Sequence, residues 1–260
     1  MIKQIKSEAR RTLAYNYKLL IIPTLMLMVS DFAIATILNY FTNIIWWSGK
    51  TDLTRLLILL IFVFFEFFMN PVSLALLYKV IITVVEDSTV CKKKIRNFIS
   101  VTNMYRIVII NFIPRFISFF AQVNNYKFSV LNLFKLDGIP LILVSIISTF
   151  ISYKFFACNY YFSLTEATVK QTLSDSFKIM SKNFFKWILL LLTFSGWIAL
   201  ELAIYIIIKM TFGDGLQTFT PIIDSLVSSG YGVGLYLTPY FYLTMCGFFK
   251  ERSVLLKLHT

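Results

Sequence analysis

Residues 54–84 read TRLLILLIFVFFEFFMNPVSLALLYKVIITV, an apolar run that holds only three charged side chains, Arg55, Glu66 and Lys79. A helix that crosses the hydrocarbon core of a bilayer, which is about 30 Å thick, needs roughly 20 apolar residues. This stretch exceeds that length, and it therefore predicts a transmembrane helix.

Further stretches of the chain have a similar length and composition. The predicted spans lie near residues 19–45, 54–84, 105–123, 138–163, 185–210 and 222–248. Apolar residues make up 58% of the chain and charged residues 15%, against about 45–50% and about 25% in soluble proteins. We therefore expect one all-α integral membrane domain over residues 1–260, a polytopic bundle of about six helices. Pro114 and Arg115 leave a second possibility for 105–123, a broken or re-entrant helix.

Histidine and cysteine are scarce. The single histidine is His259, and the three cysteines, Cys91, Cys158 and Cys246, stand far apart in the sequence. A cluster of His and Cys metal ligands and a histidine-based nucleophile pair are therefore not expected. We expect no metal, no cofactor and no enzymatic activity.

Lysine and arginine alternate along the chain with the predicted spans. Most of the 25 lie in the first, third, fifth and last non-spanning segments: Lys3, Lys6, Arg10, Arg11 and Lys18; Lys92, Lys93, Lys94, Arg96 and Arg106; Lys170, Lys178, Lys182 and Lys186; Lys250, Arg252 and Lys257. Because cytoplasmic loops retain such residues, both termini are predicted to be cytoplasmic. The net charge of +12 then indicates contact with anionic lipid headgroups on that face rather than with nucleic acid.

Two stretches outside the spans are predicted to be interfacial amphipathic helices. In the first, Ile2, Ile5, Ala9 and Leu13 share one helical face. In the second, Ser163 and Glu166 have the spacing of a capping box. After them, an apolar stripe (Val169, Leu173, Phe177, Met180 and Phe184) lies opposite a charged one (Lys170, Asp175, Lys178 and Lys182). The second helix is either a surface for a partner or lipid, or an ordinary elbow between spans.

Short motifs in both halves of the chain resemble a known family. They are SEAR at 7–10, Leu13, NY at 16–17, NP at 70–71, TLSDSFKIM at 172–180, KW at 186–187, FSGW at 194–197, PY at 239–240, Thr244 and Phe249. This order resembles the bacterial integral-membrane family catalogued as domain of unknown function 975. Residues 107–147 have no counterpart, and 148–154 lack the family's Ile-Pro-Gly turn. The resemblance implies a multi-pass protein of the bacterial cell membrane, and it brings no known activity or site residues.

Five ionisable residues fall inside the predicted spans. They are the acids Asp31, Glu66 and Glu201 and the bases Arg115 and Lys154. A charge near the bilayer centre costs about 2.5–3.5 kcal/mol on insertion scales, so such residues usually face the bundle interior and find partners. The five form either a site for a proton, an ion or a charged ligand such as a headgroup or peptide, or a set of interhelical pairs that only fix packing.

Small residues in the last two spans favour close helix packing. Gly230 and Gly234 stand four residues apart, and Gly196 lies in the fifth span. Together with the intramembrane charges, the pattern predicts a protein that handles or transports a small hydrophobic or charged ligand. The alternative is an accessory or interaction protein of an export, envelope or peptide-protection system, with other membrane proteins as partners.

Overall fold

The computed structural model describes residues 1–40, 60–86, 91–125, 150–197 and 231–255, together with 57, 199–200, 203 and 206–207. The long helices are α1 (Ile2–Tyr40), α3 (Asn70–Glu86), α5 (Val101–Asn125) and α12 (Tyr231–Leu255). The short ones are the π-helix η2 (Phe65–Met69), α4 (Cys91–Phe98), α7 (Cys158–Thr165), α8 (Val169–Lys182) and α9 (Phe184–Leu192). No strand occurs in these ranges, so the part of the chain that is described is all-helical.

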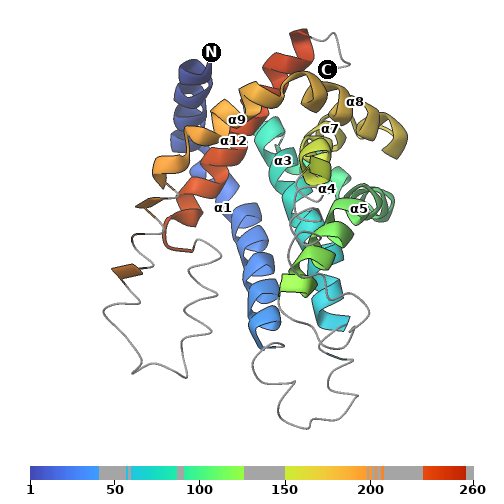
Figure 1. The fold of residues 1–260 in the computed structure, drawn as a ribbon. Coiled ribbons are helices and arrows are strands. Elements are labelled where there is room, and N and C mark those ends of the chain that lie inside the picture. Colours follow the sequence, from blue (N-terminus) through green and yellow to red (C-terminus); the bar gives the residue numbers. More distant parts are fainter. Residues whose placement is uncertain are drawn as a thin grey trace.

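Helix α3 is the centre of the bundle (Figure 1). It packs against α1, α4, α5, α7 and α12. Its side chains Leu77, Tyr78 and Ile81 are completely or almost completely buried. A helix that is apolar on every side, as the 54–84 sequence is, is expected in such a position.

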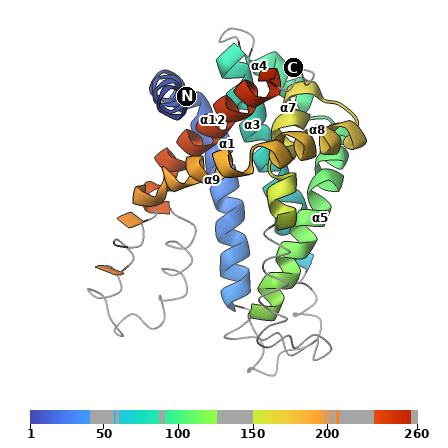
Figure 2. The ribbon, with the colours of Figure 1, turned by 45° about the horizontal axis from the view of Figure 1, so that its top comes forward.

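Helix α1 runs without a break through the predicted interfacial stretch and into the first predicted span. Ile5, Ala9 and Leu13 are all buried, as their shared face predicts, and they belong to the core formed with α3 and α12. The predicted interfacial stretch is therefore continuous with the first predicted span, and its apolar face contacts protein. Pro23 lies inside α1, and the helix axis changes direction along its length (Figures 1 and 2). Proline explains such a bend because it lacks the N–H for one helical hydrogen bond.

Helix α8 is capped and oriented differently from the prediction. Its N-cap is Thr168, whose side chain accepts a hydrogen bond from the backbone N–H of Gln171, so Ser163 and Glu166 do not form a capping box. The buried face carries Thr172, Asp175, Ser176, Ile179 and Met180. Of the predicted apolar stripe, Met180 is buried and Val169 and Leu173 pack against a buried cluster, whereas Phe177 and Phe184 are partly exposed. These two rings still contact the bundle, Phe177 at Phe155 and Phe184 at Tyr153.

Two helices in the described ranges are long and apolar enough to cross a membrane, Ile2–Ile34 and Leu60–Val85. The predicted spans 138–163, 185–210 and 222–248 lie partly outside the described residues. Pro114 does not break α5, which continues through it to Asn125, so the broken-helix alternative for 105–123 does not hold.

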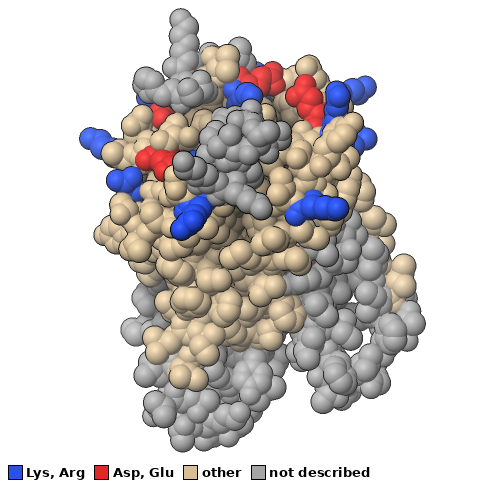
Figure 3. Space-filling model, turned by 180° about the vertical axis from the view of Figure 1, so that it is seen from behind, with Lys and Arg blue, Asp and Glu red and all other residues tan. Residues whose placement is uncertain are grey.

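Exposed apolar side chains and charged side chains occupy different parts of the surface. Large apolar residues are exposed on the later part of α1, on residues 57 and 60–64, on α5 and on α9: Ile22, Leu25, Val29, Leu60, Phe64, Phe112, Ile113, Phe116, Phe185, Leu189 and Leu192. Both termini lie at one end of the bundle (Figure 1). On the face in Figure 3, the described charged residues gather toward that end, and the opposite half shows none.

Candidate functional site

Side chains from four helical elements meet in a polar network in the apolar part of the bundle. The network joins Asp31 of α1, Glu66 of η2, Asn70 of α3 and Arg115 of α5. Arg115 Nη1 lies 3.3 Å from Glu66 Oε1 in an ion pair, and Arg115 Nη2 donates to Asn70 Oδ1. Asn70 Nδ2 in turn donates to Asp31 Oδ1. One amide therefore connects the carboxylate of α1 to the guanidinium of α5.

The four residues differ sharply in exposure. Glu66 and Asn70 are each 1% exposed, whereas Asp31 is exposed and the side chain of Arg115 is 25% exposed. The two carboxylates face a single guanidinium, so the network carries one formal negative charge when both acids are ionised. Asp31 is the acid of the network that has no ion pair with Arg115.

The π-helix η2 places Glu66 and Asn70 in this network. Its widened turn is closed by the hydrogen bond from the backbone N–H of Asn70 to the carbonyl of Phe65. The next residue is Pro71, which has no N–H to donate to the preceding turn. Insertions of this kind are frequent at functional sites. The Asn-Pro pair thus comes at the point where the helix must widen, and Asn70 is the network residue that the sequence analysis did not select.

The structure brings together three of the five predicted intramembrane charges. Lys154 lies elsewhere, where Nζ donates to Ser181 Oγ at 2.5 Å and stands 5.3 Å from the centre of the Phe150 ring. Glu201 lies outside the described residues. Lys154, one of the two candidate cations, therefore does not join the network of Asp31 and Glu66. A lysine has a long, flexible side chain, and here it reaches toward α8 rather than into the bundle.

Gly196 shows no close packing against the described part of the chain. A β-carbon built there meets no heavy atom within 4 Å in the described part of the chain. Gly230 lies outside the described residues, and for Gly234 only its place in α12 is described. The close approach occurs instead at Gly247, where a β-carbon would stand 2.8 Å from Ile5 Cγ2. The missing side chain of Gly247 lets α1 and α12 touch.

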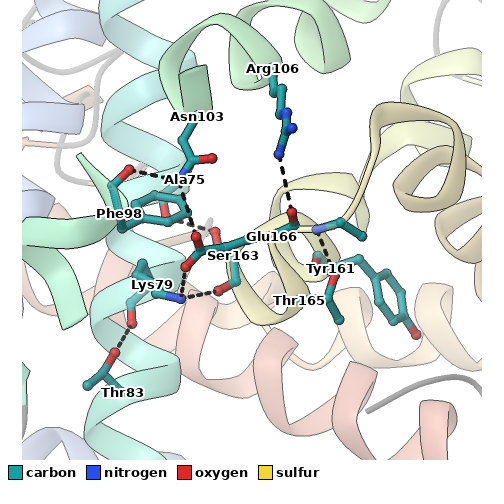
Figure 4. Close-up of polar contacts among 11 residues, drawn as sticks. Ala75, Lys79, Thr83, Phe98, Asn103, Arg106, Tyr161, Ser163, Thr165 and Glu166 are labelled. Atoms are coloured by element: carbon teal, nitrogen blue, oxygen red, sulfur yellow. Dashed lines mark hydrogen bonds and ion pairs between the residues drawn. The ribbon is translucent and has the colours of Figure 1, made fainter. Parts of the chain in front are cut away.

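A second polar cluster, which the sequence analysis missed, joins α3 to the turn between α7 and α8 (Figure 4). Lys79 is 9% exposed, and its Nζ lies 2.8 Å from Glu166 Oε1 and 3.0 Å from the carbonyl oxygen of Ser163. The same ammonium stands 5.1 Å from the centre of the Phe98 ring. A buried ammonium without partners would be strongly destabilising. Lys79 is the one charged residue between Leu74 and Val84, and a single charge in an apolar segment indicates that a partner lies nearby.

Residues of α5 complete this cluster. Asn103 Nδ2 donates to Glu166 Oε2 and to the carbonyl of Phe98, in both cases at 3.2 Å. Arg106 Nη1 donates to the backbone carbonyl of Glu166 at 3.4 Å. Glu166 itself has φ 50°, the left-handed conformation that allows the sharp turn after α7. Contacts from α3 and α5, together with the end of α7, therefore fix the strained backbone of Glu166. They also fix the direction in which α8 leaves the bundle.

A pair of uncharged side chains links α5 to α7, and on α5 it lies between the residues of the two clusters. The side-chain amides of Asn111 and Asn159 donate to each other's carbonyl oxygens at 2.9 Å, and both residues are buried. No group of three or more His, Cys, Asp or Glu residues that could hold a metal ion occurs among the described residues.

Searches against protein-family models, curated proteins and solved structures find nothing that matches the chain. The resemblance to the membrane family of unknown function therefore stays a prediction.

Proposed function

We propose that the chain is a multi-pass protein of the bacterial cell membrane that handles a small cationic ligand at the network of Asp31, Glu66, Asn70 and Arg115. The observation that carries the proposal is the excess of carboxylates over cations in the network. A buried Glu66 already paired with Arg115 leaves Asp31 as the acid whose charge lacks a cation of its own in the network. A proton or a monovalent cation has the charge that balances it.

Two described helices are long and apolar enough to cross a membrane, and we propose that the whole chain has about six spans. The exposed apolar side chains on α1, α5 and α9 support it, because a soluble surface rarely shows such large apolar areas. Termini and charged residues at the same end support cytoplasmic termini that contact anionic headgroups (Figures 1 and 3). We propose a non-enzymatic role, since the sequence offers no histidine-based nucleophile pair.

The proton is the first probe. Purified protein is reconstituted into vesicles that contain a pH-sensitive dye, and a potassium diffusion potential is applied to draw protons inward. We expect faster acidification than in protein-free vesicles, and we expect D31N to return the rate to the protein-free level. K154Q is the matched control, because Lys154 lies outside the network, and it should keep the wild-type rate. Equal rates in wild-type, D31N and protein-free vesicles would rule out proton handling at this network.

The second candidate function, an accessory or interaction protein, is favoured by one surface. Lys170, Lys178 and Lys182 are exposed on α8 beside the exposed ring of Phe177. A basic helix face with an aromatic residue suits an acidic partner segment. Replacement of the three lysines by glutamate should then abolish co-purification with that partner and leave vesicle acidification unchanged, which distinguishes the two functions.

A further inference from the structure

A cavity of about 660 Å³ opens where the first turns of α1 cross the last turns of α12. Its walls also include Ile82 and Val85 of α3 and Tyr160 and Leu164 of α7. This volume lies within the range of about 300–1,000 Å³ that is usual for small-molecule sites. The cavity lies at the opposite end of α1 from Asp31, so it is separate from the proposed cation site.

The floor and the rim of this cavity differ in chemistry. The floor is apolar and is formed by residues from three helices: Ile5, Ala9, Ile82, Leu243 and Cys246. The rim carries the carboxylates of Glu8 and Glu251 and the ammonium of Lys250. Glu8 and Lys250 are exposed, and Glu8 Oε1 accepts a hydrogen bond from Gln4 Nε2 at 3.2 Å.

A zwitterionic amphiphile matches both parts of the cavity. An acyl chain would contact the apolar floor, since removal of its CH₂ groups from water is favourable. An ammonium in the headgroup would face Glu8 and Glu251, and a phosphate would face Lys250. A purely anionic headgroup would leave both carboxylates of the rim without a partner, and a purely cationic one would leave Lys250 without a partner.

We propose that this cavity binds a single-chain amphiphile with a zwitterionic headgroup, of the lysophosphatidylethanolamine type. The site stands at the end of the bundle where the termini and the charged residues lie (Figures 1 and 3), which the proposed topology places at the cytoplasmic leaflet. This inference does not depend on cation handling at Asp31.

Native mass spectrometry of the full chain in dodecyl maltoside tests the proposal with two probes of equal chain length, lysophosphatidylethanolamine and lysophosphatidylglycerol. We expect one equivalent of the zwitterionic probe to bind about fivefold more tightly than the anionic one, since each exposed ion pair contributes only about 0.2–1 kcal/mol. The double variant E8Q/E251Q makes the rim cationic and should reverse the preference. K250Q should weaken both probes.

Two further variants separate this site from adsorption to the apolar surface. A9F places a ring on the cavity floor and should prevent binding of both probes, whereas D31N changes an exposed acid on the same helix that is outside the cavity and should bind like wild type. Equal affinities of the two probes for the wild type, or an unchanged preference in E8Q/E251Q, would overturn the proposal. D31N that loses proton uptake but keeps the amphiphile would show that the two sites are independent.

Discussion

Lys79 of α3 and Glu166 of the α7–α8 turn form an ion pair with 2.8 Å between Nζ and Oε1, although they lie 87 positions apart in the sequence. Lys79 is buried, while the side chain of Glu166 is 40% exposed. Loss of the ion pair would therefore destabilise the charged lysine more than the charged glutamate, because only the lysine is shielded from water.

Loss of the carboxylate at position 166 should destabilise the protein. In E166A the buried ammonium of Lys79 keeps only the carbonyl of Ser163 and the ring of Phe98. We expect a loss of about 2 kcal/mol, below the 3–5 kcal/mol of a fully buried pair because Glu166 is partly exposed. Thermal unfolding in detergent measures it. The double variant K79M/E166A should recover part of the loss, and a double variant less stable than E166A would contradict this account.

The left-handed conformation of Glu166 gives a separate prediction. Both E166A and E166G lack the carboxylate, so they differ only in how their backbones accept φ 50°. A residue with a β-carbon pays about 1–2 kcal/mol for this conformation, whereas glycine does not. E166G should therefore unfold at a higher temperature than E166A. The opposite order would mean that the turn relaxes out of the left-handed region.

Gly247 should not tolerate a side chain. In G247A the new β-carbon would meet Ile5 Cγ2 at 2.8 Å and force α1 away from α12, at a cost of about 1–3 kcal/mol. Thermal unfolding should show this loss, and I5A should restore stability in the double variant. G196A is the matched control, because a β-carbon there meets nothing within 4 Å in the described chain. An equal loss in both glycine variants would contradict the packing role of Gly247.

Removal of the guanidinium should leave Glu66 as an unpaired buried carboxylate. Glu66 is 1% exposed, and Arg115 is its cation in the network. We expect R115M to lose about 3–5 kcal/mol. E66L/R115M should be much more stable than R115M alone, because it removes the orphaned charge. The stability of the two variants in detergent measures this, and no recovery in the double variant would show that Arg115 acts through another contact.

Local patterns in the sequence predicted faces of helices better than partners between helices. The three- and four-residue spacing of Ile5, Ala9 and Leu13 identified a buried face, because that spacing depends on one helix alone. The spacing could not show whether this face contacts lipid or protein, because its protein neighbour α12 lies more than 200 residues away in the sequence. The same limit explains Lys154, whose charge was evident from the sequence but whose contact with Ser181 depends on where α8 packs.

Two other features were missed for related reasons. Ser163 and Glu166 have the spacing of a capping box, but the chain turns at Glu166 and α8 begins only after Thr168. Asn70 stood out in the sequence only as the neighbour of Pro71. Its role as a bridge was missed because its two hydrogen-bond partners come from helices distant in sequence. The pairing of Glu66 with Arg115 was easier to anticipate, since two opposite charges in apolar segments have few other partners.

The π-turn at Phe65–Met69 also sets the rotational phase of the second helix. Such a turn holds one more residue than an α-turn, so side chains before and after it are displaced by about 100° relative to an unbroken helix. Phe62, before the turn, packs against Ile34 of α1, while Leu77, after it, lies in the central core. Deletion of a single residue from the turn would bring the two halves into phase and rotate Phe62 away from α1. A one-residue change in length at this point would therefore rotate the part of the helix before the turn relative to the part after it.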